Sequence, residues 1–378
     1  MLLVLTAANA LRLPAQQTDS TGPKLNVDAR QINVPVVVHD KKGSLAQNLT
    51  KDNFILQVDG HPQTIQSFKL DPDLPLTLGL LVDTSTIQEG ALNDVRIASA
   101  AFFDDMLTSP ADRDKAFVVQ FARQADLLQD VTGSMPKLHA ALKQLNASGA
   151  GGRTSETSSV SDASDSGSAR GRRGGTTLYD ALFLSSDEVI GKQKGRKALI
   201  LLSDGVDSGS KESLTSTIEA AQRADTVVYA IYFKGKDPER GFRVGNGDDG
   251  GGYPGDPGGY PGGGYPGGYP GGGYPGSGYP GGGGQRRQPQ GIPLPDGKKI
   301  LEHIVKETGG RLFEVSRKQT MADIYKQIGE ELRAQYRLTF TSDEKAVSDG
   351  YHRIDLSLTK SSPKDLYIQT REGYYTGQ

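Results

Sequence analysis

The strongest constraint on the fold comes from two nearly continuous apolar runs, at residues 76–82 and 198–202. Each run has the length of a strand. A strand without alternating polar positions is typical of a parallel sheet that is covered on both faces. Loops that leave parallel strands meet at one edge of the sheet, and ligands of open α/β folds bind at that edge. We therefore expect residues that are far apart in the sequence to share one site.

Strands and helices alternate through the central part of the chain, which predicts an α/β fold with a doubly wound, mainly parallel sheet. The predicted strands cover residues 76–83, 116–122, 125–128, 197–203, 226–233 and 311–315. The predicted helices cover residues 89–107, 135–145, 178–190, 211–224, 297–308 and 321–335.

Antiparallel β units are predicted on both sides of this α/β domain. Residues 24–72 alternate between apolar and polar positions, which predicts a small β-sandwich-like unit. Residues 336–376 alternate in the same way, and three antiparallel strands are the simplest prediction for them. Pro35 lies in the first strand and cannot donate a backbone hydrogen bond, so we expect that strand at a sheet edge or with a bulge.

Two inserts interrupt the α/β domain, which we assign to residues 74–335. Residues 147–173 are rich in Ser, Gly and Asp, and we expect a flexible loop there. Residues 236–295 contain six Tyr-Pro-Gly units and almost no β-branched apolar side chains, so we expect them to be disordered. Two interpretations of this second insert remain open: a weak, multivalent interaction segment, or a spacer.

Oxygen-bearing side chains follow the two apolar runs and the first insert. They stand in the tripeptides Asp83-Thr84-Ser85, Gly174-Gly175-Thr176 and Ser203-Asp204-Gly205. Donor sets made of oxygen alone suit a hard cation such as Mg²⁺, which keeps several water ligands. The alternative is that the aspartates cap helices and the glycines form tight turns.

These tripeptides resemble the metal-ion-dependent adhesion site of the von Willebrand factor type A domain. That site uses an Asp-x-Ser-x-Ser loop, a threonine after Gly-Gly, and an aspartate before a glycine; Asp83, Ser85, Thr176 and Asp204 match it. Ile87 replaces the second serine and offers no oxygen. The resemblance implies that Asp83 and Ser85 hold Mg²⁺ or Mn²⁺ directly.

The same resemblance implies further roles. Thr176 would supply a mobile hydroxyl, and Asp204 would act directly or through a water. An acidic side chain of a protein partner would complete the coordination. Because Ile87 breaks the motif, a contact surface that works without metal stays open as the alternative.

The resemblance extends beyond the metal motif. The stretch 49–54, followed by Asp59-Gly60, is similar to the leader that precedes the type A domain in a group of bacterial von Willebrand factor A-related proteins. The ending at residues 371–375 resembles the close of the same group. The likeness therefore spans nearly the whole chain apart from the two inserts.

The N-terminus predicts export. The first ten residues are apolar and end in Ala8-x-Ala10, which is typical of the end of a secretory signal peptide, and we assign residues 1–17 as a leader. A disordered N-terminus is the alternative. No other stretch has the length of a membrane helix. We therefore expect a secreted, periplasmic or cell-envelope protein.

The sequence lacks the residues that are characteristic of several classes of function. The chain has no cysteine, which excludes disulfides and thiolate metal sites, and its net charge of −2 gives no electrostatic footprint for nucleic acid. The five histidines do not cluster, and phosphate-loop and Gly-x-Ser-x-Gly motifs are missing. We expect a protein that binds another protein rather than an enzyme. The alternative is an assembly scaffold of the envelope that acts through its β units and the Tyr-Pro-Gly segment.

Overall fold

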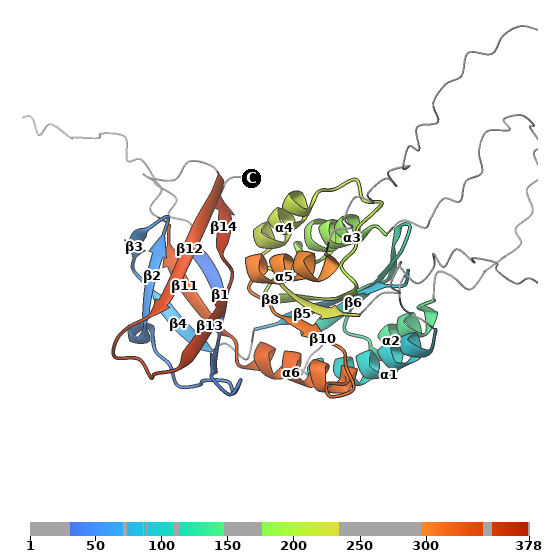
Figure 1. Cartoon of the computed structure of the whole chain (residues 1–378), viewed down its shortest axis with the longest axis horizontal. Coiled ribbons are helices and arrows are strands. Elements are labelled where there is room, and N and C mark those ends of the chain that lie inside the picture. The colour runs from blue at the N-terminus through green and yellow to red at the C-terminus, as the bar shows by residue number, and fades with distance from the viewer. Residues whose placement is uncertain are drawn as a thin grey trace, which may run out of the picture.

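The computed structural model describes residues 31–70, 74–85, 87, 89–108, 113–146, 176–233, 296–342 and 350–376. The predicted leader, both inserts, and the glycines at 174 and 175 lie outside the described residues. Within the described part, an all-β body stands beside an α/β body (Figure 1).

A six-stranded sheet forms the centre of the α/β body, in the order β10-β9-β8-β5-β6-β7. All neighbouring strands run parallel except β6 and β7. Its strands are β5 (Leu76–Asp83), β6 (Lys115–Phe121), β7 (Ala125–Thr132), β8 (Arg196–Ser203), β9 (Val227–Tyr232) and β10 (Leu312–Glu314). The two apolar runs lie side by side as β5 and β8, and every position of β5 is buried. The predicted doubly wound, mainly parallel sheet is confirmed.

Helices cover both faces of this sheet (Figure 1). One face carries α1 (Glu89–Met106), α2 (Met135–Gln144) and α6 (Met321–Arg333). The other carries α3 (Leu178–Leu184) with its π-helical continuation η2 (Ser185–Ile190), α4 (Leu214–Arg223) and α5 (Gly297–Thr308). The helix predicted at 211–224 begins later, at Leu214, because the Ser213 hydroxyl accepts a hydrogen bond from the Ser216 amide (3.1 Å) and caps it there.

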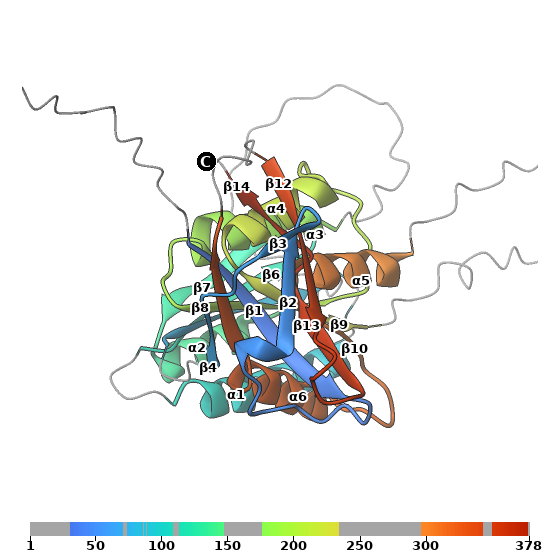
Figure 2. The ribbon, with the colours of Figure 1, turned by 90° about the vertical axis from the view of Figure 1, so that its left-hand side faces the viewer.

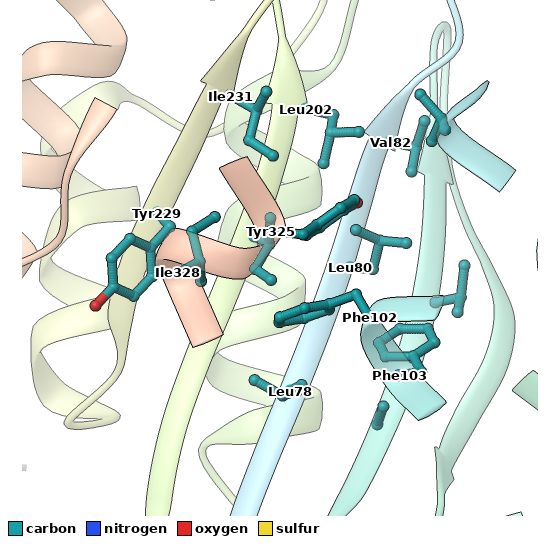
Figure 3. Packing of buried hydrophobic residues seen from close by; sticks show 14 of the residues in the cluster. Leu78, Leu80, Val82, Phe102, Phe103, Leu202, Tyr229, Ile231, Tyr325 and Ile328 are labelled. Atoms are coloured by element: carbon teal, nitrogen blue, oxygen red, sulfur yellow. The ribbon is translucent and has the colours of Figure 1, made fainter. Parts of the chain in front are cut away.

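Aromatic side chains join α1 and α6 over the sheet (Figure 3). The rings of Phe102 and Tyr325 stack with centroids 4.7 Å apart, above Leu80 of β5. The buried hydroxyl of Tyr325 lies 2.7 Å from the Ser99 hydroxyl, which satisfies both groups. This packing fixes the two helices against the strand that ends at Asp83.

The all-β body is one sandwich built from both ends of the chain (Figure 2). Its two sheets have the orders β13-β1-β11-β4 and β14-β12-β2-β3. The N-terminal side supplies β1 (Gln31–Asp40), the short 3-10 helix η1 (Lys51–Asn53), β2 (Phe54–Val58), β3 (His61–Gln63) and β4 (Ser67–Leu70). The C-terminal side supplies β11 (Tyr336–Thr341), β12 (Gly350–Leu358), β13 (Leu366–Thr370) and β14 (Gly373–Thr376). The sequence predicted two separate units, whereas the structure pairs their strands and inserts the α/β domain between them.

Two details of the β prediction are wrong. The C-terminal part has four strands rather than three, because residues 373–376 pair with β12 after a short turn. The strand that contains Pro35 is not an edge strand, since β1 lies between β11 and β13. Proline is tolerated there because β13 pairs only with Val36–Asp40. The ladder between β1 and β13 therefore ends before Pro35, and no backbone donor is needed at that residue.

Substitution of Gly79, in the middle of β5, tests how tightly the central sheet is packed. A Cβ at this position would lie 2.4 Å from both Leu199 Cδ2 and Phe117 Cζ. We expect Gly79→Ala to lower the free energy of unfolding by about 1–3 kcal/mol, as overpacked cores do. Urea titration followed by circular dichroism measures this change. Gly90→Ala is the control, because a Cβ there meets nothing within 4 Å; equal effects of the two variants would contradict the described packing.

Candidate metal site

Three of the four predicted ligands meet at the carboxyl edge of the parallel strands. Asp83 is the last residue of β5, and the neighbouring strand β8 ends at Ser203. The Ser85 amide donates a hydrogen bond to Asp83 Oδ1 (3.0 Å), and the Ser85 hydroxyl donates to the same oxygen. The Ser85 hydroxyl also lies 3.0 Å from the hydroxyl of Thr176. The structure thus brings Asp83, Ser85 and Thr176 into one group of oxygens.

Asp204 lies beside this group without bonding to it. Its Oδ1 accepts a hydrogen bond from the Val206 amide (3.0 Å), and it makes no hydrogen bond with the other three predicted ligands. Its negative charge nevertheless contributes to raising the pKa of Asp83, so the two carboxylates are electrostatic neighbours. Asp204 is therefore a neighbour of this group rather than a hydrogen-bonded member of it.

Two serines to which the sequence analysis gave no role hold the site in place. The Ser203 hydroxyl donates to Asp83 Oδ2 (2.8 Å), and it accepts from the Gly205 amide (3.0 Å). The Ser208 hydroxyl accepts from the Thr176 amide (3.0 Å), and the Ser208 amide donates to the Thr176 carbonyl (3.0 Å). The sequence signal was their position close to Asp204: Ser203 directly precedes it at the end of β8, and Ser208 follows in the next loop.

The turn after β8 requires a glycine. Gly205 has φ 77°, and a Cβ there would lie 2.0 Å from the carbonyl oxygen of Gly297 at the start of α5. Conversely, a Cβ at Gly297 would lie 2.1 Å from the carbonyl oxygen of Asp204. Helix α5 therefore packs directly against the turn that carries Asp204, and the two glycines make this approach possible.

Burial determines the electrostatics of the site. Asp83 is fully buried, and desolvation raises its pKa from 3.8 to about 6, against the opposing effect of the hydrogen bonds from Ser85 and Ser203. Burial also raises the pKa of Asp204. No Lys, Arg or His of the described residues forms an ion pair with Asp83. A bound cation would supply the missing positive charge.

The donor set fits a hard cation only in part. Within the described ranges, no three His, Cys, Asp or Glu side chains are close enough to hold a metal, so hydroxyl oxygens must contribute. Asp83, Ser85 and Thr176 provide such a set, with Asp204 beside it. Ile87 is 5% exposed and packs in the hydrophobic core beneath α1, so it leaves one motif position without an oxygen. Waters or a partner would have to fill the remaining coordination positions.

The chain is similar to several solved structures at low sequence identity. An aerotolerance-related membrane protein from Bacteroides fragilis is 13% identical, with a TM-score of 0.39 over 68% of this chain and 98% of that one. The mussel byssus proximal thread matrix protein 1 with a zinc-occupied MIDAS motif is 13% identical, with a TM-score of 0.43 over 73% of this chain and 50% of that one. The vWF domain of the pili tip protein Mfa5 from Porphyromonas gingivalis is 16% identical, with a TM-score of 0.27 over 35% of this chain and 39% of that one.

No family model and no curated protein matches the chain. Because every TM-score above is below 0.5, the assignment of the fold depends on the strand order and on the three motif segments at one sheet edge. The α/β domain has the doubly wound sheet that the resemblance to the von Willebrand factor type A domain implies, and we call the group formed by Asp83, Ser85 and Thr176 the type A site. Among the helices that the structure describes, none combines the length and the apolar character needed to cross a membrane.

Replacing Asp83 tests the electrostatics of the type A site. Its pKa is higher in the folded protein than in the unfolded chain, so the stability of the metal-free protein falls as the pH rises from about 4 to about 6. A shift from 3.8 to about 6 corresponds to roughly 3 kcal/mol at most. We expect Asp83→Asn, in the presence of a chelator, to be more stable than the wild type at pH 7 and to lose this pH dependence.

Thermal unfolding across that pH range measures the effect. Asp187→Asn is the control, because Asp187 is exposed and lies in η2, outside the group of oxygens at the sheet edge. A metal-free Asp83→Asn variant that is less stable than the wild type at pH 7, with the same pH profile, would contradict the account.

Proposed function

We propose that this protein is a secreted or cell-envelope protein that binds another protein through the metal edge of its type A domain. The observation that carries the proposal is the buried Asp83 carboxylate, which has no cationic partner among the described residues; it accepts a hydrogen bond from the Ser85 hydroxyl, which in turn contacts the hydroxyl of Thr176. An uncompensated buried carboxylate destabilises a fold, and such groups are characteristic of binding sites.

In this proposal Asp83, Ser85 and Thr176 hold a divalent cation, Mg²⁺ or Mn²⁺, and Asp204 acts beside them. When bound, the ion supplies a positive charge that attracts an acidic side chain of the partner. Ser203 orients the Asp83 carboxylate, and Ser208 fixes the backbone of Thr176. The role of this chain's residues is thus to position the oxygens that hold the cation.

One observation favours a second candidate function. Ile87 occupies a ligand position of the motif with a buried apolar side chain. If it prevents metal binding, the same edge acts as a metal-independent contact surface. The envelope scaffold, built on the β-sandwich and the Tyr-Pro-Gly segment, is the remaining alternative.

Substitution of Ile87 tests the metal proposal. We expect Ile87→Ser to bind Mn²⁺ at least about tenfold more tightly than the wild type, because it restores an oxygen at the defective position. Isothermal titration calorimetry at pH 7 measures the affinity. Ile87→Ala is the matched control, since it opens the same space without adding an oxygen. Equal Mn²⁺ affinity of the serine and alanine variants would remove this explanation of the defect.

Deletion of residues 236–295 separates the binding protein from the scaffold. If the type A edge binds the partner, the deletion leaves capture of envelope proteins unchanged in a pull-down, and Asp83→Asn abolishes that capture. If the protein is a scaffold, the deletion removes its self-association in light scattering, and Asp83→Asn has no effect. The second pattern would contradict the proposed function.

A further inference from the structure

A cavity of about 230 Å³ lies between the β-sandwich and the α/β domain. It is lined by Arg196 and Lys197, the first residues of β8, and by Asn33 and Tyr336 of the sandwich. Both chain connections between the two bodies also line it, at Leu74 and Gln335. Because β8 starts here and ends at the metal edge, the cavity lies at the opposite edge of the parallel sheet. A ligand in it would contact both domains.

Basic groups outnumber acidic ones in the lining. Arg196, Lys197 and Arg337 line the cavity, and Asp225 is the single acidic residue among the described lining residues. Asp225 is already paired, because the buried Arg371 donates to its Oδ1 (2.8 Å). The guanidinium group of Arg196 also has a hydrogen-bond partner, because it donates to the carbonyl oxygen of Leu332 (2.9 Å).

Lys197 differs from these arginines. It is half-buried and forms no ion pair with any described carboxylate. Burial lowers its pKa, and the charge of Asp225 opposes that effect. The ammonium group is therefore held in a partly desolvated position without a bonded counter-charge.

Gln335 places an unsatisfied amide donor at the same cavity. Its Nε2 is buried and has no hydrogen-bond acceptor in the described part of the chain. Buried donors without acceptors are rare in folded proteins, and each is expected to have a partner that the chain alone does not supply. The lining also includes the apolar residues Pro35, Leu74 and Val227.

We propose that this cavity binds a small organic carboxylate. The anionic group accepts hydrogen bonds from the Lys197 ammonium and the Gln335 amide, and the apolar part packs against Leu74 and Val227. The mixed lining favours an organic acid over inorganic phosphate, which has no apolar part to bury. The site is independent of the metal edge, and its occupation stabilises the contact between the two domains.

The test uses the full chain with benzoate as the probe at millimolar concentration. Thermal unfolding and isothermal titration calorimetry are compared for the wild type, Lys197→Met and Lys194→Met. Lys194 is exposed and lies just before the same strand, so its variant is the matched control. Benzamide, the neutral analogue, and inorganic phosphate serve as competing probes.

We expect benzoate to raise the unfolding temperature of the wild type and of Lys194→Met, and to bind Lys197→Met at least about tenfold more weakly, as expected for a charge-assisted hydrogen bond. Benzamide and phosphate should leave the unfolding temperature unchanged. Lys197→Gln repeats the test if the methionine variant does not fold. Three results would each overturn the proposal. They are no binding of benzoate to the wild type, binding of benzoate to the Lys197 variants as tight as to the wild type, and binding of phosphate as tight as that of benzoate.

Discussion

The parallel pairing of β5 with β8 is the constraint on which the rest of the structure depends. It places Val82 opposite Leu202, so the residues that follow, Asp83 and Ser203, become neighbours at the end of the sheet. The hydrogen bond between them orients the carboxylate and buries it. Because both strands are covered on their two faces, water cannot solvate Asp83 from below. The sheet therefore buries a negatively charged carboxylate, and in the metal proposal a bound cation compensates its charge.

The insertion of the α/β domain into the sandwich gives the molecule two distinct ends. One end carries the oxygen group of the type A site, and the other carries both connections to the sandwich and the cavity with Lys197. The eight residues of β5 span the distance between the two ends, and the seven steps between their Cα atoms amount to roughly 23 Å at about 3.3 Å per step. Arg371 makes a polar contact between the domains, because it donates to Asp225 of the α/β domain and to the Asn33 carbonyl oxygen of the sandwich.

The sequence predicted the α/β fold and the meeting of Asp83, Ser85 and Thr176, because strand length and motif position are local signals. It could not predict that the two β units form one sandwich, since the pairing of β1 with β11 joins segments separated by the whole α/β domain. The prediction that Pro35 lies in an edge strand was wrong for a similar reason. The strand β13 that covers this side of β1 comes from the other end of the chain, and its pairing stops just before Pro35. Ser203 and Ser208 act through hydrogen bonds that only the folded loops define.

The most direct measurement of the central claim is a crystal structure of the protein soaked in Mn²⁺, with the ion located by its anomalous scattering. The account predicts one peak at the carboxyl edge of β5 and β8, within coordination distance of oxygens of Asp83, Ser85 and Thr176. A peak elsewhere, or empty density at this edge in saturating Mn²⁺, would contradict it.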